Sequence, residues 1–547
     1  MRPYFIIVSI LVIVLGILLT IVDILWAWSF IIIVPFLVLG LYDVLQKQNN
    51  IWRNYPWIGH LKSLLVDNRD IAQNWLLEND REGMPFNNIQ RNIIYKRSAD
   101  APQESPFGTQ FNYYKEGFEW LLHSAAPIKL DGEDLRTLVG GPDCKHPYSC
   151  SILNVSAMSF GSISKTATMA LNGGAKLGNF ASNTGEGGLT KYHIHYGGDL
   201  IFQFGTAYFG CRDKDGNFDE GLFKQVVRHP NVKMVEMKIS QGAKPGYGAV
   251  LPGPKNTPEI SAIRDTVPYL TIVSPAGHTT FSTPVELMKF VKKMRDLSDG
   301  KPIGFKMCLG QPYEFLAICK AMLKTGIMPD FITIDGGEGG TGAAPFDSIN
   351  WVGMPALDAL VFAYDTLVGF DLKKHIKLFV SGKVVSGFQV VKYLALGADA
   401  CYSARGMMFA LGCVQAMMCN ENTCPSGVTT MNPNLANGIV PEDKKLKVAN
   451  FHNNTINSVK EMLGAAGLKN LDALNRKQIA RRTTASAIKS LDEIHPYPET
   501  GCLLTENYPE RWVKDMAMAN PDNFHPNGWD YVEKDNKRDK ALLINIT

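Results

Sequence analysis

Short apolar runs that end in glycine-rich or polar loops, each followed by a helical segment, recur from Ser151 onward. Eight of these runs are predicted as strands, at 152–157, 179–182, 234–239, 270–273, 303–306, 331–334, 378–380 and 400–402. Strands that alternate with helices and carry polar loops at their C-terminal ends are typical of an α/β chain folded as a (β/α)8 TIM barrel. A doubly wound open sheet is the alternative, but no G-x-G-x-x-G follows an early strand. The segment 196–223 is interpreted as an insertion between the second and third strands.

The N-terminal segment is almost wholly apolar from Tyr4 to Leu41, with Asp23 as its interruption. Because about 20 apolar residues span a bilayer, two membrane helices are predicted, at 4–21 and 24–45. A cleaved signal peptide is disfavoured, since a second apolar run follows directly and no small-residue cleavage site is present. A buried soluble hairpin would need a very apolar partner. The flanking cations are Arg2, Lys47, Arg53 and Lys62. They predict a two-pass protein of the inner (cytoplasmic) membrane, with the body of the chain in the cytoplasm.

The length of 547 residues allows roughly two to four domains. The predicted order is a transmembrane hairpin at 1–45, a helical and proline-rich irregular linker region at 46–150, the barrel at 151–482 and an irregular C-terminal arm at 483–547. Trp75 belongs to the amphipathic part of the linker region, and Trp512 and Trp529 to the arm. A formal charge of +3 without a basic stripe argues against nucleic acid as a partner.

Charged and amide side chains gather after two of the predicted strands. Glu186 stands between glycines at a strand end, where the plain alternative is a turn with a solvated carboxylate. Lys238 lies in an apolar strand, in which a cation needs a partner, and Gln241 and Lys244 follow it. Arg264 lies further along the chain, and its fork suits a bidentate carboxylate. These residues could hold a dicarboxylate.

A second group has the character of a nucleotide site. Small residues after the first strand let the backbone approach a flat ring, against which Met158 could lie. Lys306 ends another apolar strand and could neutralise negative charge on such a ring, or simply reach the barrel mouth. Phosphate in these barrels binds at the loops after the last two strands. The candidate residues for a mononucleotide are Ser156, Ala157, Met158, Ser159, Lys306, Gly339, Gly340, Thr341, Ser381, Gly382, Lys383, Ala404, Arg405 and Gly406.

Three cysteines lie close together in the sequence, in the pattern Cys413-x5-Cys419-x4-Cys424-Pro425. Closely spaced thiolates, often with a proline after the last, hold iron–sulfur clusters, and three ligands fit a three-iron cluster best. Zinc would usually require a fourth ligand, and none is close in the sequence. The remaining alternative is three unconnected buried thiols.

Taken in order, these motifs resemble the FMN-binding synthase domain of glutamate synthase. The segments that carry the resemblance are 156–161, Glu186 with its glycines, 238–246, 339–345 and 413–428, and together they cover about 151–482. The resemblance implies FMN, a [3Fe-4S] cluster and an oxidoreductase that acts on CH–NH2 groups. It implies that 2-iminoglutarate, formed from 2-oxoglutarate and ammonia, is reduced to L-glutamate.

The matching positions imply roles for individual residues. Lys238, Gln241, Lys244 and Arg264 would hold the oxoacid, with Glu186 near the reacting nitrogen. The cysteines at positions 413, 419 and 424 would hold the cluster that feeds electrons to FMN.

Three departures from the family pattern change what is expected. A membrane hairpin stands where a glutaminase domain with an N-terminal cysteine would begin, so ammonia is expected free or from an ammonia-supplying partner. The segment 274–278 replaces a proline-rich stretch with paired histidines near the substrate side. No nicotinamide domain is recognised, so the electron donor is expected to be external. The alternatives are a related flavin enzyme for another 2-oxo acid, an amine or an N-substituted glutamate, and a non-catalytic membrane electron relay.

Overall fold

A computed structural model describes residues 2–46, 52, 56–57, 59–60, 79–130 and 134–527. The chain divides into two compact units, Met1–Asn88 and Ile89–Thr547, and each is described by itself.

The N-terminal unit contains two apolar helices, α1 (Arg2–Val22) and α2 (Phe30–Leu45), joined by the 3-10 turn η1 (Ile24–Ser29). Asp23 caps η1 by accepting a hydrogen bond from the Leu25 amide at 2.9 Å. The segments Tyr4–Val22 and Ile24–Leu45 have mean hydropathies of 3.3 and 2.5, and only 6% of each is buried. Length and composition therefore allow both to cross a membrane. The predicted flanking cations Lys47, Arg53 and Lys62, and Trp75, lie outside the described residues.

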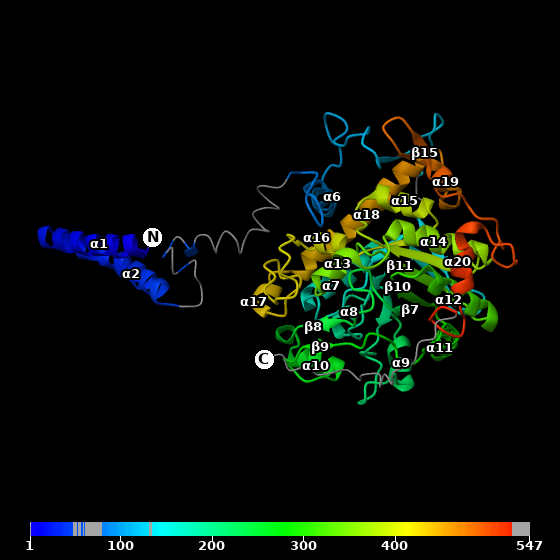
Figure 1. Ribbon diagram of the computed structural model, residues 1–547, viewed down its shortest axis with the longest axis horizontal. Helices are drawn as coiled ribbons and strands as arrows, with labels where there is room; N and C mark the ends of the chain where they lie inside the picture. The colour runs from blue at the N-terminus through cyan, green and yellow to red at the C-terminus, as the bar shows by residue number, and fades with distance from the viewer. Residues whose placement is uncertain are drawn as a thin grey trace. The chain divides into compact units, whose positions relative to one another are not determined.

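In the second unit, eight described strands form a closed parallel barrel (Figure 1). In barrel order they are β4 (Leu153–Val155), β5 (Ser182–Asn183), β6 (Leu200–Phe204), β7 (Val232–Lys238), β10 (Ile303–Met307), β11 (Phe331–Asp335), β12 (Lys377–Ser381) and β13 (Ala400–Ser403). Helices that pack against them include α7 (Lys165–Gly178), α9 (Glu220–Val227), α11 (Pro284–Leu297), α14 (Ala356–Gly369) and α15 (Gly387–Ala395). The predicted (β/α)8 fold is confirmed.

Two strand assignments from the sequence were wrong. The run 270–273 does not join the barrel, because β9 (Ile272–Val273) pairs antiparallel with β8 (Val250–Leu251) in a separate hairpin. The third barrel strand is instead β6, inside the segment interpreted as an insertion. Every residue of β6 is buried, as is typical of a parallel strand covered on both faces. Short apolar runs of similar length do not reveal which of them pairs with the barrel.

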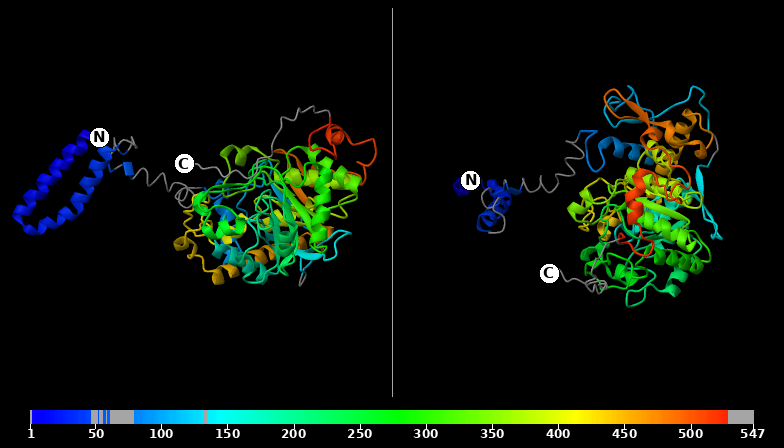
Figure 2. Two further views of the ribbon diagram at one scale, coloured as in Figure 1. Left: turned by 90° about the horizontal axis from the view of Figure 1, so that it is seen from below. Right: turned by 45° about the vertical axis from the view of Figure 1, so that its right-hand side comes forward.

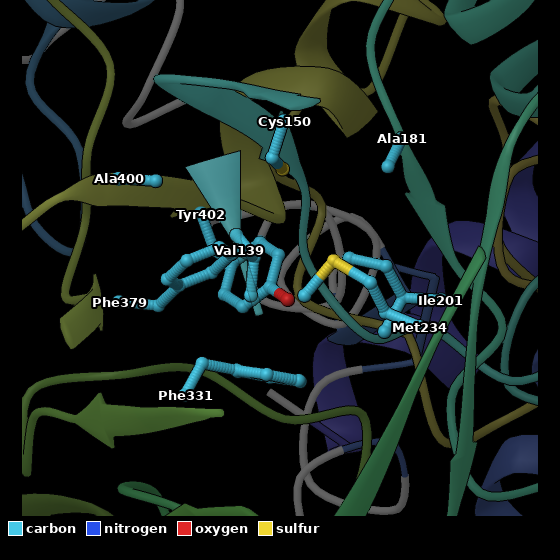
Figure 3. Close-up of a cluster of buried hydrophobic side chains, with 9 residues drawn as sticks. All are labelled: Val139, Cys150, Ala181, Ile201, Met234, Phe331, Phe379, Ala400 and Tyr402. Carbon is cyan, nitrogen blue, oxygen red and sulfur yellow. The ribbon is translucent and has the colours of Figure 1, made fainter. Parts of the chain in front are cut away.

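The N-terminal end of the barrel is closed by apolar side chains. A buried cluster combines the early residues of the strands with Val139 and Cys150, which belong to the hairpin of β2 (Arg136–Val139) and β3 (Tyr148–Ser151) (Figure 3). The cluster consists of Val139, Cys150, Ala181, Ile201, Met234, Phe331, Phe379, Ala400 and Tyr402. The hairpin therefore plugs this end, and the opposite end is left for ligands.

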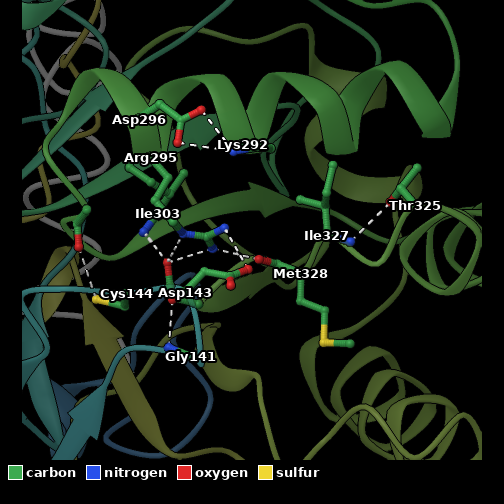
Figure 4. A network of polar contacts seen from close by, with 12 residues as sticks. Gly141, Asp143, Cys144, Lys292, Arg295, Asp296, Ile303, Thr325, Ile327 and Met328 are labelled. Carbon is green, nitrogen blue, oxygen red and sulfur yellow. Dashed lines mark hydrogen bonds and ion pairs between the residues drawn. The ribbon is translucent and has the colours of Figure 1, made fainter.

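A buried carboxylate joins the plug to the barrel. Asp330 accepts hydrogen bonds from the amide of Gly141 at 2.6 Å and from that of Ile303 at 2.7 Å. Arg295 donates to Asp330 at 2.9 Å and to the carbonyl of Met328 at 2.6 Å (Figure 4). Each charge in this network is thus satisfied by the protein itself.

The outer part of this unit contains a three-stranded antiparallel sheet of β1 (Glu119–Leu121), β14 (Ile479–Arg482) and β15 (Ile488–Ser490). Later in the chain, α20 (Glu510–Met518), drawn in red in Figure 2, packs against α12 (Pro312–Thr325) and buries Trp512. The described part of the predicted C-terminal arm thus contains regular elements. Trp529 and the rest of the arm from residue 528 lie outside the described residues, and the predicted domain boundaries stay predictions.

Candidate functional site

The C-terminal ends of the barrel strands open onto a cavity with about 1010 Å³ of empty space, which includes the open solvent at its mouth. Among the described residues, those on or just after seven of the eight barrel strands line it, and β12 contributes none. The hairpin of β8 and β9 forms a further wall.

The charges in the cavity are unbalanced. Among the described lining residues, six side chains are cationic and one is a carboxylate. The cations are Lys238, Lys244, Lys255, Arg264, Lys306 and Arg405, and the carboxylate is Glu186. Buried cations require counter-charges, so the cavity suits a ligand with several negative groups.

Glu186, Lys238 and Gln241 form one hydrogen-bonded group in the lining of this cavity. The Lys238 ammonium donates to a carboxylate oxygen of Glu186 in a short contact and to Gln241 Oε1 at 2.6 Å. Burial alone would raise the pKa of the Glu186 carboxyl, but Lys238, with Lys244 and Lys306 further away, holds that pKa below its usual value. Glu186 is therefore an anion at neutral pH, and it contacts Lys238, whose own pKa is lowered by burial against the opposing effect of Glu186.

Lys244 and Arg264 are cations with no carboxylate bound to them in the described structure. The Lys244 ammonium donates to the carbonyl of Ala343 at 2.9 Å, and burial, aided by the charge of Lys238, lowers its pKa to about 8. Arg264 donates through one Nη to the carbonyl of Phe160 at 2.8 Å. Its Nε is buried and has no hydrogen-bond partner among the described residues. An orphaned guanidinium N–H of this kind fits a carboxylate ligand.

The predicted nucleotide residues divide into two sets. Those that line the cavity are Ala157, Met158, Ser159, Lys306, Gly340, Thr341, Ala404 and Arg405. Those that are not among its lining residues are Ser156, Gly339, Ser381, Gly382, Lys383 and Gly406. Gly185 lets the loops after β4 and β5 meet: its φ is 65°, and a Cβ there would collide with the Ser159 amide nitrogen. Because glycine has no side chain, the two loops approach each other backbone to backbone at this position.

The loop after β12 is engaged within the protein. Ser381 donates a short hydrogen bond to Asp335, and Glu338 accepts from the amide of Ala356 at 2.9 Å, at the start of α14. A Cβ on Gly382 would lie 3.1 Å from a Glu338 carboxylate oxygen. A carboxylate thus stands beside the predicted phosphate loop, and the phosphate position stays a prediction.

The three cysteines lie around Arg405. An Nη of Arg405 donates to Cys419 Sγ at 3.5 Å. Burial lowers the pKa of this guanidinium, but Cys419, Cys413 and Cys424 outweigh that effect and raise it. Burial raises the pKa of Cys413 to about 11, whereas the hydrogen bonds of Cys424 with Ser426 and Thr429 overcome burial and lower its pKa.

The described residues hold no group of three His, Cys, Asp or Glu side chains that is placed to bind a metal ion. The cluster predicted from the cysteine spacing is therefore not shown. The donor chemistry does fit one, since thiols that converge on a buried cation can ionise and share a cationic neighbour.

Sequence reasoning missed several lining residues. Lys255 follows β8 rather than a barrel strand, and its ammonium donates to the carbonyls of Ser162 at 2.7 Å and Cys419 at 3.1 Å. Gln203 was missed because β6 was interpreted as part of an insertion. Phe209 lines the cavity from the loop after β6, and Ser274 lines it from the end of β9. No spacing signal in the sequence marks either residue.

Residues 143–469 match the conserved region in glutamate synthase. The glutamate synthase large subunit-like protein YerD of Bacillus subtilis is 33% identical over 503 residues, which cover 84% of this chain and 95% of that protein. The archaeal glutamate synthase (NADPH) of Methanocaldococcus jannaschii is 33% identical over 358 residues, which cover 65% of this chain and 66% of that protein. An archaeal-type glutamate synthase (NADPH) of Thermotoga neapolitana is 32% identical over 327 residues, which cover 60% of this chain and 61% of that protein.

Proposed function

Because this chain belongs to the glutamate synthase family, we propose that it is a glutamate synthase-like oxidoreductase that reduces 2-iminoglutarate, formed from 2-oxoglutarate and ammonia, to L-glutamate. The observation that carries this proposal is the cavity at the barrel mouth. It brings Glu186, Lys238, Gln241, Lys244 and Arg264 together in a strongly cationic wall. A site that must bind a dicarboxylate and a flavin phosphate requires such an excess of positive charge.

The oxoacid would be held by the cations that lack a carboxylate partner. The unpartnered Nε–H of Arg264 and the ammonium of Lys244 can each donate a hydrogen bond to a carboxylate oxygen of the substrate. Gln241, whose Oε1 accepts from Lys238 at 2.6 Å, keeps its amide N–H groups for a further oxygen. Two separated carboxylate contacts would fix the substrate in one orientation.

Glu186 and Lys238 would act at the reacting carbon–nitrogen bond. Hydride addition to the carbon of the protonated imine, C=NH2+, gives the neutral amine without a further proton transfer. The ionised Glu186 carboxylate can stabilise a cationic imine nitrogen and hold its N–H by hydrogen bonding. Lys238 keeps Glu186 ionised, because a carboxylate buried without a cation would protonate.

FMN would lie in the same cavity. Ala157, Met158 and Ser159 would lie against the ring, Lys306 would supply a cation, and Gly340, Thr341 and Arg405 would supply further polar contacts. When bound, FMN provides the hydride, and the protein provides its orientation and electrostatic surroundings. The cationic excess and the close loop contact at Gly185 support this placement.

Electron supply and location belong to the same proposal. Cys413, Cys419 and Cys424 would hold a [3Fe-4S] cluster, with Arg405 and Lys255 as nearby cations. A Cys419→Ser variant should then lose iron and the EPR signal of a three-iron cluster; unchanged iron content contradicts the assignment. Electrons would come from an external donor, and nitrogen from ammonia or a partner that supplies it. The two apolar helices would anchor the chain in the cytoplasmic membrane, with the barrel on the cytoplasmic side.

A second candidate is a related enzyme that acts on another 2-oxo acid. Ser274 favours it, because this residue begins the segment that departs from the family pattern and lines the cavity with its hydroxyl unpartnered among the described residues. A hydroxyl at this wall could accept a substrate with a different distal group.

One experiment separates these candidates. Full-length protein in detergent is reduced anaerobically and mixed with 2-oxoglutarate plus ammonium, and flavin reoxidation is followed by absorbance. The proposal predicts reoxidation with both components together and little with either alone. Reoxidation by a different 2-oxo acid, with none by 2-oxoglutarate plus ammonium, would replace the first candidate by the second.

A further inference from the structure

His278 ends the segment 274–278 that departs from the family pattern, and it is not among the described lining residues of the cavity. It is buried at 6% exposure. Its two ring nitrogens have different partners: Nε2 lies 2.9 Å from the carbonyl oxygen of Lys238, and Nδ1 lies 3.0 Å from the hydroxyl of Tyr208. The histidine therefore touches the backbone of a residue whose side chain lines the cavity.

These partners determine the tautomer. A carbonyl oxygen can only accept, so the hydrogen must be on Nε2, and Nδ1 must accept from the Tyr208 hydroxyl. The Tyr208 oxygen in turn lies 3.1 Å from the amide of Thr279 and 3.3 Å from that of Thr280, both of which donate to it. Burial lowers the pKa of His278 to about 4, so the ring is neutral at pH 7.

Aromatic neighbours hold the plane of the ring. Phe281 stacks on His278 with centroids 5.0 Å apart and planes at 25°, and Phe204 meets it edge-on at 6.4 Å and 88°. With one face stacked on Phe281 and both nitrogens hydrogen-bonded, the imidazole has one orientation. Its Nε2–H is consequently a fixed donor aimed at one carbonyl.

That carbonyl lies where the strand ladder ends. The pairing of β6 with β7 finishes at Phe204 opposite Met237, one residue before Lys238. On the other side, β10 continues the pairing through Lys306 opposite Lys238. His278 thus binds the backbone of β7 at Lys238, one residue after its pairing with β6 ends. The side chain of Lys238 contacts Glu186 and Gln241.

We propose that His278 is a positioning residue: its Nε2–H fixes the Lys238 carbonyl, and thereby the contacts of the Lys238 ammonium with Glu186 and Gln241. The importance of Lys238 for substrate rests on the proposed function, but the positioning itself does not. Two conservative substitutions separate the two ring contacts. In His278→Gln the amide nitrogen falls near the Nε2 position and can still donate to Lys238. In His278→Asn the amide falls near Nδ1 and reaches only Tyr208.

The test uses full-length protein in detergent and trace acetic anhydride, with the acetylation of Lys238 relative to Lys306 measured by mass spectrometry. His278→Asn should raise this ratio about fivefold or more, because the Lys238 ammonium leaves its partners more often. His278→Gln should stay within about twofold of the wild type. Tyr208→Phe, which keeps the donor but frees Nδ1, should give an intermediate ratio, and thermal unfolding confirms that each variant is folded.

Equal ratios in folded His278→Asn and His278→Gln variants would overturn the proposal. If His278→Asn does not fold, His278→Met, which also lacks a donor to Lys238, replaces it, and a ratio equal to that of His278→Gln overturns the proposal. The labelling uses no substrate, so a wild-type protein that fails to react with 2-oxoglutarate and ammonium would refute the proposed function and leave this test intact.

Discussion

The two ends of the barrel differ in how their buried charges are balanced. At the N-terminal end, Asp330 is bound by Arg295 and by two backbone amides, beneath an apolar cluster. At the C-terminal end, six cations and one carboxylate line an open cavity in the described structure. The closed end therefore stabilises the fold, whereas the mouth carries more cations than carboxylates, an excess that an anionic ligand would balance. Substitutions at the two ends should accordingly change different properties.

The largest effect should come from the closed end. Asp330→Ala would remove the buried carboxylate of Arg295 and leave only the exposed Asp143, at 3.8 Å. Loss of one partner of a buried ion pair typically costs about 3–5 kcal/mol. Thermal or urea unfolding of detergent-solubilised protein measures this loss. Asp296→Ala is the matched control, since the Lys292–Asp296 pair is exposed (Figure 4) and should contribute less than about 0.5 kcal/mol. A variant at position 330 no less stable than this control would refute the structural role of the network.

At the mouth, Lys238→Met should reduce turnover with a smaller effect on stability. The change removes the cation that keeps Glu186 ionised, and loss of one such electrostatic contact costs about 100- to 1000-fold in rate. Anaerobic flavin reoxidation measures the rate, and thermal unfolding measures the stability. Lys191→Met, at an exposed ion pair with Glu259, should leave both unchanged. A Lys238→Met variant that lost stability as severely as Asp330→Ala would erase the contrast between the two ends.

The predictability of the two ends also differs. The barrel and the group around Glu186, Lys238 and Arg264 could be predicted, because apolar strands that end in charged residues are unusual in a sequence. The third strand could not, since β6 and β9 are both short apolar runs whose pairing depends on tertiary contacts.

The missed residues have the same explanation. Lys255 and Ser274 reach the cavity from a hairpin outside the barrel repeat, so no strand-end pattern marks them. His278 acts on a backbone carbonyl, and such a contact leaves no signature in residue spacing.

A moderate effect is expected from Arg264→Lys. Lysine keeps the charge but lacks the planar fork, so the Kd for 2-oxoglutarate should rise about tenfold, which corresponds to about 1.4 kcal/mol. Titration of the flavin absorbance with 2-oxoglutarate measures this Kd. Arg212→Lys provides the control, because Arg212 lies over the same Phe209 ring but is not among the described lining residues. Equal effects of both variants would mean that Arg264 acts through packing alone.

The smallest effect is a pH dependence. The pKa of Lys244 is lowered to about 8, so this side chain is a cation below pH 8 and loses its charge as the pH rises through that value. Affinity for the dicarboxylate should fall above pH 8, by about fivefold between pH 8 and pH 9. Lys255 also has a pKa of about 8, so Lys244→Arg is needed to isolate Lys244. That variant, which stays protonated, should flatten the decline; an unchanged profile would assign the titration elsewhere.

The central claim is that the excess of cations over carboxylates at the barrel mouth serves to bind an anionic flavin. The direct measurement is the flavin content of full-length protein, purified in detergent after expression with riboflavin and released by heat denaturation. The account predicts a yellow protein that releases about one FMN per chain, with a several-fold lower content in a Lys306→Met, Arg405→Met double variant that remains folded. A colourless wild-type protein that contains no FMN under these conditions would contradict it.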